Sequence, residues 1–112
     1  MTTITIVQLT APFQLANADA TVYTTPTLST AKIGRAVFTN TTASAVTITA
    51  GITTGGALAA GTTMISARNL APGEAYVSPE LAGAVLPAAS VIRAYCSAAT
   101  SVTFTASGLL VQ

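Results

Sequence analysis

Residues 45–52, which read Ala45-Val46-Thr47-Ile48-Thr49-Ala50-Gly51-Ile52, decide the fold class of this 112-residue chain. Apolar side chains occupy every second position from Val46 to Ile52, and threonine or glycine fills the positions between them. A period of two is typical of a β-strand with one buried face, because successive side chains of a strand point to opposite sides. The segment is therefore predicted to be a strand whose threonines face solvent or a partner.

The same period recurs along the chain, and helical periodicity is almost absent. The predicted strands cover residues 3–8, 20–25, 32–40, 45–52, 63–70, 75–77, 91–97 and 101–111. Loop 41–44 is expected to join two of these strands as a hairpin. Residues 71–74 suit a type II turn, because Pro72 presets the φ of its position and Gly73 supplies the positive φ that follows.

One short turn of helix is expected near residues 79–82. Ser78 can cap it, Pro79 suits the first helical position, and Glu80 favours the positive end of the helix dipole. Gly83 can end the turn.

About eight short strands separated by glycine and proline turns pack best as two antiparallel sheets. We therefore expect an all-β fold with a single domain over residues 1–112, an antiparallel β-sandwich of jelly-roll topology. Residues 1–10 are expected to form an N-terminal arm or an edge strand. The predicted core contains Ile48, either Met64 or Ile65, Val77, Leu81, Leu86, Ile92, Val102 and Phe104.

The composition withholds most catalytic chemistry, since the chain has seven charged residues and no histidine. Histidine is the usual general base and the commonest metal ligand. The three carboxylates, Asp19, Glu74 and Glu80, form no pattern typical of paired-acid catalysis or of a calcium loop. Cys96 alternates with apolar residues of a predicted strand, which favours a small buried side chain over a nucleophile. We expect no enzymatic activity, no cofactor and no metal site.

The glycines of residues 53–62 indicate a mobile surface loop, because Gly55-Gly56 lacks the lysine and the strand-to-helix context of a phosphate loop. The four basic residues are dispersed, whereas nucleic-acid-binding proteins cluster theirs, so no nucleic-acid partner is expected. No apolar run approaches the roughly 20 residues of a membrane helix, and the first nine residues do not resemble a signal peptide. The lone cysteine fits folding in a reducing cytosol.

A surface this poor in charge suits burial against neighbours. Aromatic and arginine side chains are enriched at protein contacts, so six of them are candidates for a subunit or capsid interface. The alternative for the tyrosines is to cap the edge of the core, and for the arginines to lie on a solvated sheet face. The candidates are Tyr23, Arg35, Arg68, Tyr76, Arg93 and Tyr95.

Several segments carry a family resemblance. One reads Ile65-Ser66-Ala67-Arg68-Asn69-Leu70-Ala71-Pro72-Gly73-Glu74-Ala75-Tyr76 and continues through Pro79-Glu80-Leu81 and Val85-Leu86 to Ala106-Ser107-Gly108. It resembles small structural proteins encoded in the virion gene clusters of tailed bacteriophages, and residues 20–24 and 36–41 are similar to the same group. The resemblance implies a non-enzymatic β-sandwich component that attaches to a capsid or a tail, often as a trimer.

The expected function is that of a bacteriophage capsid decoration or minor capsid protein that binds and stabilises the shell. The expected partner is the major capsid protein or another virion protein. The chain is expected to be made in the bacterial host cytoplasm, to reside in the virion and to form a homo-oligomer, with a trimer favoured. A tail or head-to-tail adaptor is the alternative within this class. A carbohydrate-binding host-recognition module is the alternative from another class, but sugar sites stack on exposed aromatic rings, and the chain has no tryptophan.

Overall fold

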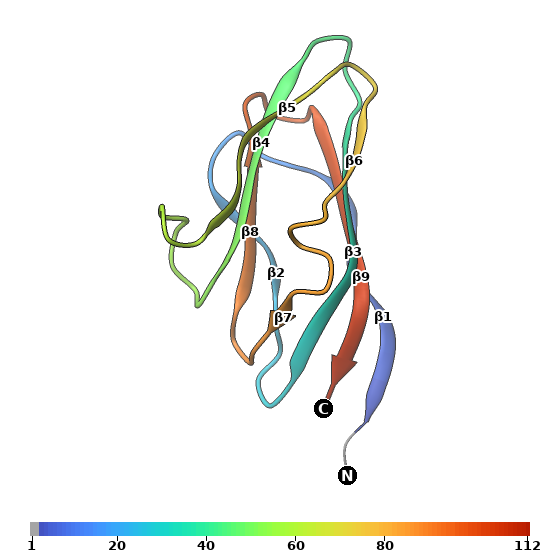
Figure 1. The fold of residues 1–112 in the computed structure, drawn as a ribbon, viewed down its shortest axis with the longest axis vertical. Coiled ribbons are helices and arrows are strands. Elements are labelled where there is room, and N and C mark those ends of the chain that lie inside the picture. The colour runs from blue at the N-terminus through green and yellow to red at the C-terminus, as the bar shows by residue number, and fades with distance from the viewer. Residues whose placement is uncertain (1–2) are drawn as a thin grey trace.

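The computed structural model describes residues 3–112, and these residues form two β-sheets packed face to face (Figure 1). The predicted all-β sandwich is confirmed, with nine strands where about eight were expected. The strands in chain order are β1 (Ile4–Gln14), β2 (Ala20–Thr24), β3 (Thr30–Asn40), β4 (Val46–Thr53), β5 (Thr63–Leu70), β6 (Ala75–Val77), β7 (Val85–Leu86), β8 (Val91–Cys96) and β9 (Val102–Val111).

The strand pairing is that of a jelly roll, the topology expected from the sequence. Sheet A has the order β1-β9-β3-β6, with β7 also paired to β3, and sheet B has the order β2-β8-β4-β5. The first strand pairs with the last, β2 with β8, β3 with β6 and β7, and β4 with β5, as in one long antiparallel hairpin that has been rolled up. Rolling adds the pairs β3–β9 and β4–β8 and closes the two sheets over one core.

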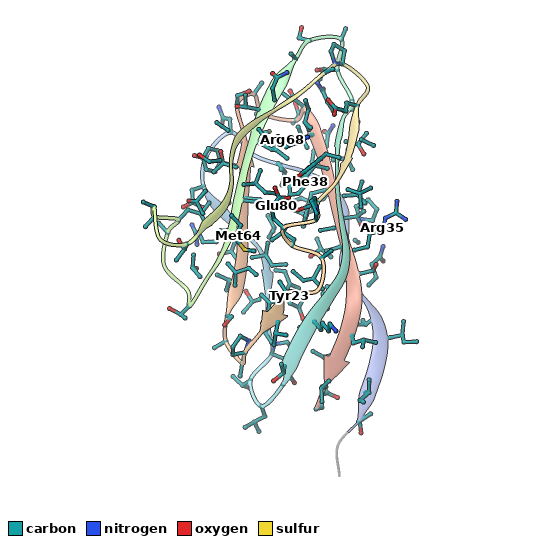
Figure 2. All side chains as sticks on the ribbon, viewed as in Figure 1. Tyr23, Arg35, Phe38, Met64, Arg68 and Glu80 are labelled. Carbon is teal, nitrogen blue, oxygen red and sulfur yellow. The ribbon has the colours of Figure 1, made fainter. Side chains whose placement is uncertain are left out.

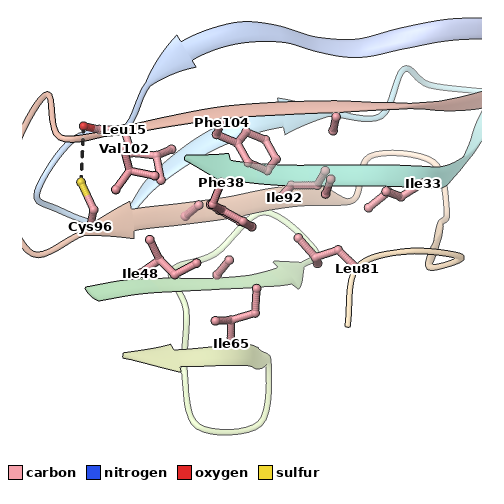
Figure 3. Packing of buried hydrophobic residues seen from close by; sticks show 14 of the residues in the cluster. Leu15, Ile33, Phe38, Ile48, Ile65, Leu81, Ile92, Cys96, Val102 and Phe104 are labelled. Atoms are coloured by element: carbon pink, nitrogen blue, oxygen red, sulfur yellow. Dashed lines mark hydrogen bonds between the residues drawn. The ribbon is translucent and has the colours of Figure 1, made fainter. Parts of the chain in front are cut away.

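The core between the sheets is apolar, and the rings of Phe38 and Phe104 pack against each other with centroids 4.8 Å apart (Figure 3). Cys96 is buried beside Leu15, as its place in the alternation predicts. The predicted core members found buried are Ile48, Ile65, Leu81, Leu86, Ile92, Val102 and Phe104. The prediction did not include four other large apolar side chains that are fully buried, those of Leu15, Ile33, Phe38 and Leu70.

One predicted core residue is wrong. Val77 is 49% exposed and lies opposite Val37 on the outer face of sheet A, whereas Tyr76 lies opposite Phe38 and packs against the core. A strand of three residues contains too few positions for alternation to show which face is buried. Of the pair at 64 and 65, Ile65 is buried and Met64 is partly exposed.

The predicted helix near residues 79–82 is wrong, because the residues from Pro79 to Gly83 form only a hydrogen-bonded turn. The capping function of Ser78 is present, since its Oγ accepts a hydrogen bond from the Leu81 N–H at 3.2 Å. Ala82 N–H donates to the Ser78 carbonyl at 3.3 Å. Gly83 then takes a φ of +80° and donates its N–H to the Ile33 carbonyl of β3, so the chain leaves the turn before a second helical bond forms.

The predicted hairpin at loop 41–44 is also wrong, because β3 belongs to sheet A and β4 to sheet B. The loop crosses between the sheets, and the buried side chain of Asn40 holds the crossing. Its Nδ2 donates to the carbonyls of Ser44, Leu70 and Ala71 at 2.8, 3.2 and 3.2 Å, and its Oδ1 accepts from the N–H and hydroxyl of Thr42.

The predicted turn at residues 71–74 is confirmed. Glu74 N–H donates to the Ala71 carbonyl at 3.0 Å, and Gly73 has a φ of +75°. The Glu74 carboxylate also accepts the Ala71 N–H at 2.7 Å. This turn joins β5 at the edge of sheet B to β6 at the edge of sheet A, and so closes one side of the sandwich.

Candidate functional site on the outer face of sheet A

The outer face of sheet A exposes apolar side chains of three strands, β1, β9 and β7, in a row that is interrupted by Lys32 of β3. Residues that lie opposite each other on paired strands share a face of the sheet. Leu109 of β9 lies between Ile6 of β1 and Lys32 of β3. Lys32 in turn lies opposite Val85 of β7. Two positions along the strands, Ile4 lies opposite Val111. The exposed fractions are 65% for Ile4, 87% for Ile6 and 56% for Val85. We call Ile4, Ile6, Val85, Leu109 and Val111 the apolar row.

Alternation explains why these residues lie outside. Ala31, Ile33 and Leu86 occupy the intervening positions of β3 and β7 and are fully buried in the core. The side chains on either side of them must therefore point outward. At this end of the molecule β1, β9 and β3 extend together beside the C-terminus (Figure 1). Several large apolar side chains gathered on one outer face mark an interaction surface more often than scattered ones do.

Two cations lie on the same outer face. Lys32 and Arg35 are exposed on β3, and Figure 2 shows the Arg35 side chain projecting away from the sandwich. Neither forms an ion pair within residues 3–112. The other charged residues of the chain have partners within the fold.

Arg93 and Asp19 form an ion pair on sheet B, with Arg93 Nε 2.9 Å from Asp19 Oδ1. Arg93 also donates to Thr21 Oγ1 at 2.9 Å, and Leu58 N–H donates to the other Asp19 oxygen at 2.8 Å. Burial alone raises the pKa of Asp19, but the Leu58 and Arg93 hydrogen bonds and the Arg93 charge outweigh it and hold this pKa below its usual value. Asp19 therefore ties the loop between β4 and β5, predicted to be mobile, to β8.

Arg68, Tyr76 and Glu80 form a second cluster, which we call the edge clamp because it joins β5 of sheet B to β6 of sheet A. The Arg68 guanidinium lies 4.0 Å from the centroid of the Tyr76 ring, a cation–π contact. The Tyr76 hydroxyl donates to Glu80 Oε1 at 2.5 Å, and the Ser78 hydroxyl donates to the same oxygen at 3.1 Å. Figure 2 shows Arg68 and Glu80 on the side of the sandwich where the chain passes between the sheets.

The clamp shifts two pKa values in opposite directions. The hydrogen bond from Tyr76 lowers the pKa of Glu80 below its usual 4.5, even though burial opposes this. Burial, and then the hydrogen bond and charge of Glu80, raise the pKa of Tyr76 above its usual 10.0, and the Arg68 charge opposes that rise.

The six predicted interface residues thus do not lie on one surface. Arg35 lies on the outer face of sheet A, and Arg68 and Tyr76 meet in the edge clamp. Arg93 and Tyr95 alternate with buried residues of β8 and lie on the outer face of sheet B. Tyr23 packs half-buried against the core, and this burial raises its pKa. Their role at an interface stays a prediction.

Sequence reasoning missed the apolar row. Ile4 and Ile6 alternate with threonines, and this pattern alone places them on one face without saying which face is covered. The remaining surface of residues 3–112 contains no pocket, and no three His, Cys, Asp or Glu side chains of these residues gather as a metal site would require. No helix in this part of the chain has the length and apolar character needed to cross a membrane.

Neither a protein family model nor a curated protein sequence matches the chain. Solved structures do match it. A structure of infectious bursal disease virus strain Gx aligns with a TM-score of 0.56 and 15% identity over 99% of this chain, and the VP2 subviral particle of the same virus aligns with 0.55 and 15% over 98%. The T13 particle of that virus gives 0.56 and 12% over 98%.

The chain spans about a third of the length of these virus proteins, with coverage of 32%, 32% and 30%. At this level of identity the similarity establishes a common fold. The structures that share this fold are thus those of a virus and of its VP2 subviral particle.

Proposed function

We propose that the chain is a non-enzymatic structural protein of a virion, and that the outer face of sheet A binds its partner in the particle. The observation that carries the proposal is the exposed apolar row beside the unpaired cations Lys32 and Arg35. The jelly-roll topology shared with virus-particle proteins supports it, because that topology recurs in capsid domains.

The sequence resemblance refines the proposal to a tailed bacteriophage. There the chain is a capsid decoration or minor capsid protein, made in the bacterial cytoplasm and carried in the virion. Its partner is the major capsid protein or another virion protein, and a homotrimer assembled on the particle is the favoured oligomer. A tail or head-to-tail adaptor is the second location within the same function, and labelling the chain in intact virions distinguishes a head position from a tail position.

The mechanism is mechanical. Burying apolar surface contributes roughly 25 cal/mol per Å², and the two cations add specificity for a partner surface that carries carboxylates. Each contact is modest, but a shell offers the same binding position many times. Copies that bridge two or more shell subunits gain from the high effective concentration of the second contact. The summed contacts resist separation of the subunits.

The test measures binding of purified chain to particles assembled without it. The double variant Lys32→Ala with Arg35→Ala is expected to lower the affinity about tenfold, which equals about 1.4 kcal/mol. The control is Ala57→Glu with Ala60→Glu, which changes the net charge by the same amount at two exposed loop positions away from the face. The control should bind like the wild type. Absence of wild-type binding, or equal losses in both double variants, would contradict the proposal.

A further inference from the structure

Strand β1 presents an open backbone edge between Ile4 and Val7. Thr3 and Gln112 exchange both backbone hydrogen bonds, at 2.8 Å each, so Thr3 is a hydrogen-bonded position of the β1–β9 ladder. Antiparallel ladders alternate between hydrogen-bonded and non-hydrogen-bonded pairs, and the register is unbroken from Ile4 to Val7. The N–H and C=O groups of Ile4 and Ile6 therefore point away from β9. Since β1 is the last strand of sheet A, they point to the open edge.

This edge lacks the devices that monomeric proteins use against strand pairing. Those devices are charged side chains, prolines, bulges and short strands. Residues 3–9 contain no charge, no proline and no glycine, and they read Thr-Ile-Thr-Ile-Val-Gln-Leu. Further along, β1 is irregular and is covered, because its register shifts after Val7 and Thr10 Oγ1 donates to the Val22 carbonyl of β2. The open part is confined to the first residues of the strand.

The other sheet edges of the described residues are less suited to pairing. Strands β6 and β7 have three and two residues. Strand β2 has five, with a register shift in its pairing to β8. Strand β5 has two register shifts against β4, and its Ala67 has a φ of +47°. The first part of β1 combines regular pairing with exposed apolar side chains.

We propose that this edge pairs with the same edge of a second copy of the chain, antiparallel and about a two-fold axis at Thr5. In that register Ile4 is opposite the partner's Ile6, and Ile6 is opposite the partner's Ile4. Both pairs are hydrogen-bonded pairs, because the backbone groups of both residues face outward. The four isoleucine side chains then meet on one continuous outer face, where directly opposite branched side chains stabilise a sheet.

A second copy fits the edge because the edge is complementary to itself. Residues 3–9 contain no charged side chain, so the two paired segments bring no like charges together across the axis. The isologous two-fold contact is the commonest way in which identical chains associate. The contact is small beside the roughly 1,200 Å² that specific stable interfaces bury, so the dimer is weak in solution and gains strength only in an array of copies. This contact is separate from the proposed binding of the outer face to a shell.

The test is sedimentation velocity on the purified chain from about 10 µM to about 1 mM, the range of weak association. We expect the wild type to shift toward a dimer with concentration. Ile6→Lys places a charge at the edge and should keep the chain monomeric over the same range. Val85→Lys is the matched control, since it puts the same charge on an exposed position of the same face, away from the edge. It should associate like the wild type.

Amide hydrogen exchange supplies a second readout, which distinguishes pairing at the β1 edge from association through the outer face of sheet A. The N–H groups of Ile4 and Ile6 should become protected as concentration rises, whereas the N–H of Thr5, which faces β9, should show the same protection throughout. Ile6→Pro keeps an apolar side chain, removes the outward N–H, and should abolish the shift, with circular dichroism showing that the sheet remains. A wild type monomeric at 1 mM, or association unchanged in Ile6→Lys, would overturn the proposal.

Discussion

Gly108 of β9 lies against the backbone of β3. A Cβ built at this position would lie 1.9 Å from the Lys32 carbonyl oxygen, a distance that the two strands can relieve only by separating. We expect Gly108→Ala to lower the free energy of unfolding by about 3 kcal/mol, measured by urea denaturation. Gly56→Ala is the control, because a Cβ there meets nothing within 4 Å and the backbone needs no positive φ. Its effect should stay within about 0.5 kcal/mol. Equal stability of both variants would contradict the close approach of the two strands.

Asn40 is a second residue on which the fold depends, because its Nδ2 donates hydrogen bonds to backbone carbonyls. Asn40→Asp keeps the shape of the side chain but turns an acceptor toward the three carbonyls that Nδ2 contacts. We expect it to cost about 3 kcal/mol at neutral pH and to exceed the cost of Asn40→Ala, about 2 kcal/mol. The same change at the exposed Asn69 is the control and should be nearly neutral. If Asn40→Asp were no worse than Asn40→Ala, the three donated bonds would not carry the stability.

At the scale of the elements, the edge clamp joins β5 of sheet B to β6 of sheet A through side-chain contacts. The lowered pKa of Glu80 and the raised pKa of Tyr76 define the pH range in which the clamp stabilises the fold. Glu80, with a lowered pKa, contributes stability above its usual value of 4.5 that is lost as pH falls. Tyr76, with a raised pKa, contributes stability below its usual value of 10.0 that is lost as pH rises.

Tyr76→Phe keeps the ring beneath Arg68 and removes the hydroxyl. We expect it to lower the free energy of unfolding by about 1 kcal/mol at pH 7. The difference from the wild type should shrink below about pH 4.5 and above about pH 10. Tyr95→Phe is the control, because the Tyr95 hydroxyl forms no hydrogen bond within the described residues, and it should show no such window. A constant difference across the whole pH range would rule out the Glu80 bond as the source.

Alternation predicted the long strands because they have enough positions to show a period of two. It did not always show which face is buried, since Ile33 and Phe38 of β3 were not among the predicted core residues. It predicted correctly that Val46, Ile48 and Ala50 of β4 are buried, and that Ile92 and Phe104 are buried. It was wrong at the end of β4, where the register shifts between Ala50 and Gly51, so that Thr53 is buried and Ile52 is only partly buried.

The prediction failed at β6, because three residues are too few to show which face of the strand is buried. Val77 was predicted to be buried and is exposed. The hairpin prediction at loop 41–44 also failed. Whether this loop joins neighbouring strands of one sheet or crosses between the two sheets depends on how β3 and β4 pair with strands far away in the sequence.

For the whole molecule, the number and spacing of strands predicted the sandwich and its jelly-roll topology. The candidate site was less predictable. Whether Arg68 meets Tyr76 depends on how the turn between β5 and β6 folds across the edge of the sandwich. Whether Ile6 is exposed depends on which face of sheet A packs against sheet B. Both facts are set by pairing between segments far apart in the sequence, which no local pattern encodes.

The hydrogen-bonded pair of Thr3 and Gln112 determines how the molecule responds to mechanical force. The two strands run antiparallel from this pair, so a pull on these two residues loads the β1–β9 hydrogen bonds one after another and unzips them at low force. A load applied across the sheets, between the face of sheet A and that of sheet B, acts on the whole apolar core at once. A load applied at Thr3 and Gln112 would therefore separate β1 from β9 easily, while anchorage through the broad face would hold.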